Sequence, residues 1–176
     1  MRTVFFDIDT QIDFVYPAGA LYVPGAECIL PVVAELNRHA PMLISTMDAH
    51  SEDDPEFQIF PHHCVAGTTG QHKPASTLLG DARQFILEKQ QLDCFSSPDL
   101  NPLLERLNAD RYVVYGVVTE ICVRYAALGL LKTGKTVEIA TDAVKALDEQ
   151  KVREMFSEFA AAGGRLATSA AILQSL

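Results

Sequence analysis

Two kinds of hydrophobic pattern alternate along the chain. Short apolar runs with few charges predict buried strands, and they lie at residues 3–9, 42–47, 84–88, 111–118, 136–140 and 165–168. Segments in which apolar side chains recur every three or four residues predict amphipathic helices, and they lie at residues 26–39, 99–109, 121–131, 148–162 and 170–176. A short helical turn is expected at residues 77–81.

Strands that alternate with helices imply right-handed crossovers between parallel strands. We therefore predict an α/β fold in three layers, with a mainly parallel sheet of about six strands between two layers of helices. A chain of 176 residues is most simply one domain, here residues 1–176, and it is large enough to bury a sizeable core.

Residues 49–74 interrupt this alternation. They show no hydrophobic periodicity and are rich in His, Pro and Gly. A loop of this length inside a compact domain usually has a function, such as a lid or a binding surface. We therefore expect part of the functional site to come from this segment.

Composition and charge narrow the functional classes. Hydrophobic residues make up 48% of the chain and charged residues 21%, as in an ordinary soluble globular protein. The net charge of −9 and the lack of a basic run predict that neither nucleic acid nor a membrane is a partner. The cysteines form no C-x-x-C pair, which fits a reducing cytoplasm better than a disulfide framework or a four-cysteine zinc site.

Polar side chains with chemical potential follow several of the predicted strands. Because the carboxyl ends of parallel strands meet at one edge of a sheet, ligands of such sheets bind at that edge. We expect one cluster to form there from Asp7, Asp9, Asp48, His50, Lys89, Cys122 and Asp142.

Cys122 is the candidate nucleophile of this cluster. Thr119 is a suitable helix N-cap, so Cys122 would lie in the first helical turn, where free N–H groups and the helix dipole favour a thiolate. Asp9 could take the thiol proton and Lys89 could stabilise both anions. Backbone N–H groups of Val118 and Cys122 are natural donors for an oxyanion. This combination predicts acyl transfer through a thioester; the alternative is a small buried cysteine that packs a helix onto the sheet.

Two further readings arise from the same residues. Asp48-Ala49-His50, followed by His62-His63, offers a carboxylate and imidazoles that could hold a divalent metal. Residues 5–10 (FFDIDT) resemble the D-x-D-x-T signature of haloacid-dehalogenase-like phosphatases. In that reading Asp7 would be the nucleophile, Asp9 the acid and base, and Mg²⁺ the cofactor, with Thr46, Lys89 and the Asp53-Asp54 pair supplying the later motifs.

Three segments resemble, in the same order, the motifs of isochorismatase-like cysteine hydrolases, the family that includes nicotinamidases. Residues 9–14 (DTQIDF) look like the D-x-Q-x-D-F opening of that family. Residues 89–95 (KQQLDCF) resemble its lysine followed six residues later by Phe. Residues 116–123 (GVVTEICV) are similar to its G-x-x-T-x-x-C-V nucleophile turn. The three motifs span nearly the whole chain and are more specific than the phosphatase signature.

The resemblance implies an isochorismatase-like hydrolase fold and a catalytic triad of Asp9, Lys89 and Cys122. It also implies a cis peptide bond between Val117 and Val118, with the Val118 N–H in the oxyanion hole. The substrate pocket would then be lined by Phe14, Val117 and Val118, and the loop would be supported by Gln11 and Asp13.

Within that family, Asp48-Ala49-His50 and residues 61–68 (PHHCVAGT) look most like nicotinamidases. The resemblance then implies that Asp48, His50 and His63 bind a divalent metal (Zn, Fe or Mn), without any organic cofactor. The D-W-H-P-x-x-H run of nicotinamidases is replaced here by Asp-Ala-His-Ser-Glu-Asp-Asp-Pro-Glu, so a further His is missing and Glu56 or Asp53 would take its place. The expected reaction is hydrolysis of a small amide, nicotinamide first, with another small amide or a vinyl ether as the alternative. Homo-oligomers are also expected from the resemblance.

Overall fold

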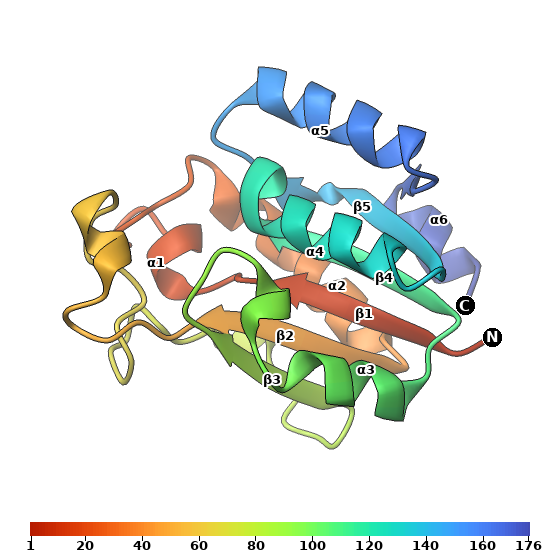
Figure 1. The fold of residues 1–176 in the computed structure, drawn as a ribbon, viewed down its shortest axis with the longest axis horizontal. Helices are drawn as coiled ribbons and strands as arrows, with labels where there is room; N and C mark the ends of the chain where they lie inside the picture. Colours follow the sequence, from red (N-terminus) through yellow and green to blue (C-terminus); the bar gives the residue numbers. More distant parts are fainter.

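The computed structural model describes residues 1–176, and its six strands form one fully parallel sheet (Figure 1). The order of the strands in the sheet is β3-β2-β1-β4-β5-β6. Their bounds are β1 Thr3–Ile8, β2 Met42–Asp48, β3 Gln84–Lys89, β4 Arg111–Val117, β5 Thr136–Lys145 and β6 Arg165–Ala167. The predicted α/β class and parallel sheet are confirmed.

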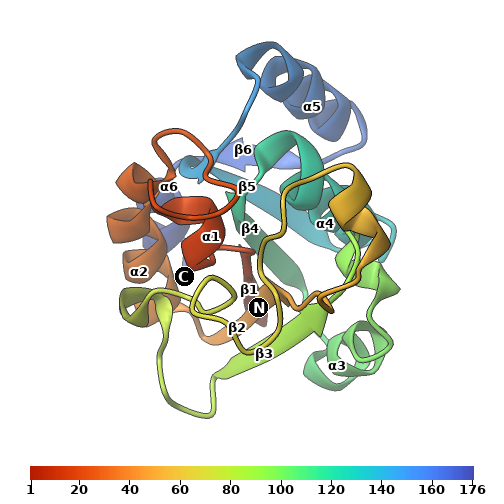
Figure 2. The same cartoon turned by 90° about the vertical axis from the view of Figure 1, so that its left-hand side faces the viewer.

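Five of the six α-helices cover the two faces of the sheet, and the short α1 lies beyond the carboxyl end of β1 (Figures 1 and 2). Helices α2 and α6 lie on one face, and α3, α4 and α5 lie on the other. Their bounds are α1 Ile12–Val15, α2 Leu30–His39, α3 Leu100–Leu107, α4 Arg124–Leu131, α5 Glu149–Ala161 and α6 Ser169–Gln174. None of these helices combines the length and the apolar character that crossing a membrane requires.

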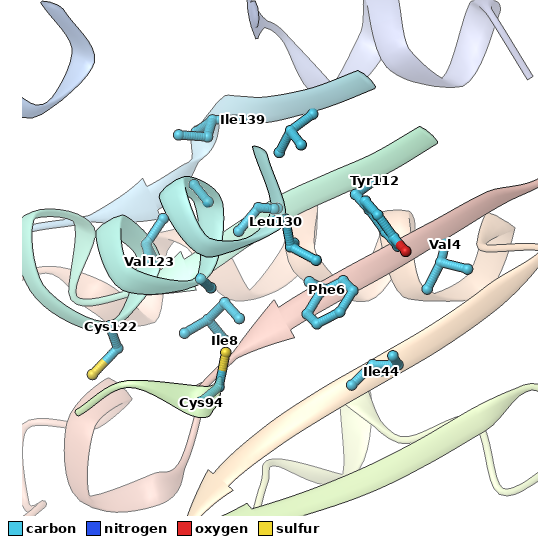
Figure 3. Packing of buried hydrophobic residues seen from close by; sticks show 14 of the residues in the cluster. Val4, Phe6, Ile8, Ile44, Cys94, Tyr112, Cys122, Val123, Leu130 and Ile139 are labelled. Atoms are coloured by element: carbon cyan, nitrogen blue, oxygen red, sulfur yellow. The ribbon is translucent and has the colours of Figure 1, made fainter. Parts of the chain in front are cut away.

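Successive side chains of the central strands point to opposite faces and build two cores. Val4, Phe6 and Ile8 of β1 pack under α3, α4 and α5, in the cluster that Figure 3 shows. Phe5 of the same strand packs on the other side, under α2 and α6. Each fully buried side chain of this kind contributes about 1.5–3 kcal/mol of transfer free energy, so β1 is held from both faces.

The strand order reverses between β1 and β4, and the crevice at such a reversal is where parallel sheets bind ligands. Close contact of these two strands depends on Gly116, which pairs with Ile8 and has a φ of 117°. A Cβ at position 116 would lie 2.1 Å from the Ile8 carbonyl oxygen, so only glycine fits. The residues that follow Ile8 and Gly116 therefore meet at one point.

Several expected bounds differ from the structure. The turn predicted at 77–81 is a 3₁₀ turn at Ala75–Thr77, and the four-residue helix α1 was not predicted. Strand β5 continues past residue 140 to Lys145 after a register shift, so Asp142 lies within the strand. Its carboxylate accepts hydrogen bonds from the N–H and the hydroxyl of Ser169, at 2.7 and 2.6 Å. Asp142 therefore holds the start of α6 and does not belong to the site.

Candidate active site at the carboxyl edge of the sheet

Asp9 follows β1 directly and is fully buried. Its backbone is left-handed, with a φ of 47°, a conformation that Asp tolerates better than most residues. Thr46 of β2 holds it there, because its hydroxyl donates to Asp9 Oδ1 at 2.6 Å. Oδ2 lies 2.9 Å from Lys89 Nζ but has no well-aligned hydrogen-bond donor. This oxygen is therefore available to accept a proton.

Lys89 is the last residue of β3 and its ammonium group is buried between two carboxylates. Nζ contacts Asp9 Oδ2 and donates a hydrogen bond to Asp48 Oδ1. Burial by itself would lower the pKa of Lys89, but the carboxylates of Asp9 and Asp48 outweigh it and raise the pKa well above its ordinary value. Lys89 therefore stays a cation and links the Asp9 side of the site to the Asp48 side.

Cys122 lies in a π-helical turn, Thr119–Val123, between β4 and α4, and is buried at the end of the core in Figure 3. Burial raises the pKa of its thiol well above the ordinary value; Lys89 opposes this effect and the Asp9 carboxylate adds to it. The expectation of a thiolate favoured by a capped helix turn is therefore wrong. The Thr119 hydroxyl makes no hydrogen bond, so it caps nothing, and desolvation outweighs the helix terminus. Cys122 rests as a thiol and needs a base.

A narrow cavity of about 60 Å³ opens beside Cys122. Val117 and Val118 line it, and the peptide bond between them is cis, as the resemblance implied. Phe14 of α1 also lines it. All of the lining residues except Glu56 are hydrophobic, so the cavity suits an uncharged, apolar group.

Asp48, His50 and His63 come together next to Lys89, as predicted, with one ligand atom from each within 4.8 Å of the others. The donor set of one carboxylate and two imidazoles is typical of a divalent metal site. His50 Nδ1 bonds Asp54 Oδ2 at 3.0 Å and His63 Nδ1 bonds the Pro61 carbonyl at 2.7 Å. These bonds leave the Nε2 atoms of both rings for a metal, as in protein metal sites with a supporting second shell.

Two observations show that these residues fit a metal ion. His50 Nε2 is buried and has no hydrogen-bond partner in the protein, which is costly unless another ligand occupies the position. Burial also lowers the pKa of His63, so its imidazole is neutral and free to coordinate at neutral pH. Burial raises the pKa of Asp48 to about 6, which still leaves most of this carboxyl ionised at pH 7.

Glu56, not Asp53, lies beside the histidines of the metal-ligand group. Glu56 Oε1 lies 3.7 Å from His63 Nε2, and the residue also lines the cavity. His50 also forms a second potential ligand group with Asp54 and Glu56. Asp53 is exposed and belongs to neither this group nor that of Asp48, His50 and His63. Asp54 instead orients His50 and caps the 3₁₀ turn Pro55–Gln58, accepting a hydrogen bond from the Glu56 N–H at 2.9 Å. An Asp before Pro is a turn signal in the sequence, but its partner His50 could not be read from it.

Replacing Glu56 with Ala should weaken Zn²⁺ binding by about 10–100-fold, because the carboxylate beside His63 Nε2 is lost. Competition for the metal with a fluorescent chelator measures this without any substrate. Asp53→Ala removes an exposed carboxylate three residues away and is the matched control. Equal affinities of the Glu56→Ala and Asp53→Ala proteins would show that Glu56 takes no part in the metal site.

Gln11 and Asp13 support the surrounding loops, as expected. The Gln11 amide donates to the carbonyls of Asp48 and Gln71 at 2.8 and 2.7 Å and accepts from the Asp48 N–H at 2.7 Å. The Asp13 carboxylate accepts from the Cys64 N–H at 2.7 Å, which fixes the chain next to His63. Gln11 therefore holds Asp48 in position, and Asp13 holds the chain beside His63.

The structure contradicts the phosphatase reading. Asp7 is fully buried below the site and its carboxylate accepts hydrogen bonds from Thr10 and Asn37, at 2.6 and 3.0 Å. Lys73 Nζ forms an ion pair with it at 3.3 Å. A nucleophile must be open to its substrate, and Asp7 lines no cavity near the cleft. Its D-x-D-x-T match reflects a structural anchor for β1.

Sequence patterns did not reveal most of the cavity wall. Leu21, Tyr22, Phe60 and Leu147 come from three loops far apart in the chain. Loop residues have no periodicity that would betray a shared cavity, and only the tertiary structure places them around Cys122. Figure 2 shows these loops, between β1 and α2, after β2, and before α5, gathered at the same end of the sheet.

The chain is similar in sequence and in fold to known proteins of one family. The isochorismatase domain model matches residues 3–171. A nicotinamidase of Acinetobacter baylyi is 26% identical over 200 residues, covering 94% of this chain and 92% of the relative. The zinc complex of the pyrazinamidase of Pyrococcus horikoshii superposes with a TM-score of 0.87 at 29% identity, over 96% of this chain and 99% of the other.

A third relative has a ligand in its structure. PnC1 from L. infantum, in complex with nicotinate, has a TM-score of 0.87 at 27% identity, and 96% of this chain and 93% of the other are covered. The family and these relatives agree with the enzyme class expected from the sequence, a hydrolase of C–N bonds in linear amides. The match of the domain model over nearly the whole chain shows that this protein belongs to the isochorismatase family.

Proposed function

We propose that this protein hydrolyses nicotinamide to nicotinate and ammonia, through a thioester on Cys122. The observation that carries the proposal is the grouping of Asp9, Lys89 and Cys122, with Cys122 at a small apolar cavity. The metal-ligand group of Asp48, His50 and His63 lies next to it, since Asp48 shares Lys89 with Asp9. Relatives named as nicotinamidases and pyrazinamidases support the substrate class.

The acylation half begins with proton transfer from the Cys122 thiol to Asp9 Oδ2. The sulfur then attacks the carbonyl carbon of the amide, and the carbonyl oxygen takes up negative charge. The N–H groups of Val118 and Cys122 would hold this oxyanion. Asp9 returns the proton to the amide nitrogen, the C–N bond breaks, and ammonia leaves a thioester behind. Lys89 stabilises the negative charge of Asp9 before Asp9 takes up the proton and after it has returned it.

The deacylation half uses water in place of the thiol. Asp9 takes a proton from the water, whose oxygen attacks the thioester carbonyl. The C–S bond breaks, the acid leaves, and the proton on Asp9 returns to the sulfur. A divalent metal held by Asp48, His50 and His63 would supply a Lewis-acid site for a ring nitrogen of the substrate.

The cavity favours a neutral ring over the vinyl ether of an isochorismate-like substrate. Such a substrate carries carboxylates, and the cavity offers hydrophobic walls and one further negative charge, that of Glu56. Burying an anion there without a cationic partner would be costly. A pyridine carboxamide is uncharged, and its ring nitrogen is a ligand that a divalent metal can bind.

An ammonia-release assay over a panel of small amides tests the proposal. We expect turnover of nicotinamide and pyrazinamide to exceed that of benzamide, which lacks the ring nitrogen, and addition of a chelator to remove the difference. Product analysis after incubation with an isochorismate-type vinyl ether tests the alternative. Hydrolysis of the ether together with no ammonia release from any amide of the panel would overturn the amide assignment.

We further propose that the enzyme works in a reducing compartment such as the cytoplasm and assembles as a homo-oligomer. The first part is supported by its four free cysteines, one of which is the proposed nucleophile. The second part rests on the family resemblance, and light scattering on the purified protein tests it.

A further inference from the structure

Glu120 lies in the nucleophile turn, two residues before Cys122, and its carboxylate is bonded to a different part of the chain. Oε1 accepts hydrogen bonds from the N–H groups of Leu147 and Asp148, both at 3.0 Å. Oε2 is buried without a hydrogen-bond partner, and Glu120 forms no ion pair. Oε1 alone therefore connects Glu120 to Leu147 and Asp148, and the Glu120 carboxylate pairs with no cation.

Residues 146–148 are the short connection between β5 and α5, and both of its ends are fixed. Val117 pairs with Lys145, the last residue of β5. At the other end, the Asp148 side chain caps α5 by accepting from the Gln150 and Lys151 N–H groups at 2.8 and 3.3 Å. The two hydrogen bonds that Leu147 and Asp148 donate to Glu120 hold this connection against the turn that carries Cys122.

The hydrogen bond to Glu120 fixes the position of the Leu147 backbone beside the cavity. Its side chain is 56% exposed, yet it lines the cavity together with Cys122 and Val118. A large apolar side chain left half in water at the mouth of a cavity gains contacts when an apolar ligand enters. The position of Leu147 therefore sets one wall of the opening.

The size of the cavity makes this wall important. Its volume of about 60 Å³ is well below the ~150 Å³ of an apolar cavity that holds benzene. A six-membered ring therefore fills this space and extends to its mouth. A wall that moves by the size of a methyl group would change which rings are accepted.

We propose that Glu120 is a positioning residue that holds Leu147 over the cavity, and that Leu147 limits the size of the acyl group. The amide class in this statement rests on the proposed function. The Glu120–Leu147 link itself does not, because it concerns only the folded protein. Glu120 acts as a hydrogen-bond acceptor, so Gln, which keeps one such oxygen, should replace it and Ala should not.

Amide hydrogen exchange tests the link without any substrate. In Glu120→Ala, exchange at the N–H groups of Leu147 and Asp148 should become at least about tenfold faster, because both lose their hydrogen-bond acceptor. In Glu120→Gln it should stay close to the rate of the unaltered protein. Equal rates in all three proteins, or equal acceleration in both variants, would overturn the role of Glu120 as an acceptor.

Substrate selectivity tests the consequence. The measured quantity is the ratio of kcat/KM for ring-methylated nicotinamides to kcat/KM for nicotinamide. Leu147→Ala should raise this ratio by about tenfold for at least one methyl position, and Glu120→Ala should shift it in the same direction. Glu120→Gln should restore the original ratio. An unchanged ratio in Leu147→Ala would show that Leu147 does not limit the acyl group.

The two proposals fail in different ways. If no amide is turned over, the proposed function falls, while the exchange rates at Leu147 and Asp148 still decide the link. If amides are turned over but the ratio does not respond, the proposed function stands and the inference falls. Alkylation of Cys122 by iodoacetamide at equal rates in the Glu120 variants would exclude damage to the nucleophile turn as the cause of a changed ratio.

Discussion

Cys122→Ala is expected to abolish ammonia release from nicotinamide, with a loss of at least about 10⁴-fold in kcat. The sulfur forms the covalent bond to the acyl group, and no other side chain in the cavity can replace it, because the remaining lining residues are hydrophobic apart from Glu56. The variant removes one small buried atom, so the fold should survive. Single-turnover mass spectrometry should detect an acylated Cys122 in the unaltered protein and none in the variant.

Cys94→Ala is the matched control for this experiment. Cys94 is buried in the same core cluster as Cys122, and burial raises its pKa to about 12, so it is an unreactive thiol at neutral pH. Replacing Cys94 should lower the free energy of unfolding slightly and leave kcat per folded molecule unchanged. Ammonia release by the Cys122→Ala protein at the rate of the Cys94→Ala protein would contradict a thioester mechanism.

Lys89→Met is expected to reduce kcat/KM by about 10³-fold and to lower the free energy of unfolding by about 3–5 kcal/mol. Methionine has nearly the same shape, but the two carboxylates that share Lys89, Asp9 and Asp48, lose their cation. Two buried carboxylates side by side cannot both stay ionised, so one takes up a proton. A protonated Asp9 cannot accept the proton of Cys122, and a protonated Asp48 binds metal poorly.

Lys73→Met separates the loss of stability from the loss of catalysis. Lys73 is also buried, and it forms an ion pair with Asp7 below the site, at 3.3 Å. Its replacement should lower the free energy of unfolding by a similar amount, which chemical denaturation measures, while folded molecules keep their turnover. Equal losses of turnover in the Lys73 and Lys89 variants would mean that Lys89 acts only through stability.

Much of the fold followed from local patterns. The run at 111–118 predicted β4 because a strand buried on both faces must be apolar at successive positions. The helix before Gly163-Gly164 was predicted with Asp148 as its first residue, and Asp148 caps it in the structure. The predicted bounds were wrong where tertiary contacts decide where an element ends. Strand β5 continues to Lys145 because it pairs with β4, which no pattern within residues 136–145 could show.

Some features of the site likewise followed from the sequence, and others depended on the tertiary structure. The sequence by itself indicated Asp9, Lys89 and Cys122, because each lies at or just after the carboxyl end of a strand of one parallel sheet. The same rule also suggested Asp7 and Asp142, which the structure places in other contacts. It also determined the metal candidates, since Asp48 and His50 lie at the end of the next strand. These inferences needed only chain order and the rule that parallel strands end at the same edge.

Only the tertiary structure showed that Cys122 is a thiol and that Asp7 pairs with Lys73. It also showed that Glu56 rather than Asp53 lies beside His63. The position of Leu147 in the cavity wall and its hydrogen bond to Glu120 were likewise visible only there. Each depends on burial or on contact between residues distant in the chain. Desolvation and hydrogen bonding act through space, and a sequence pattern carries information mainly about neighbours within one strand or helix. The residues able to react were therefore visible in the sequence, while their charge states and the shape of the space around them came from packing.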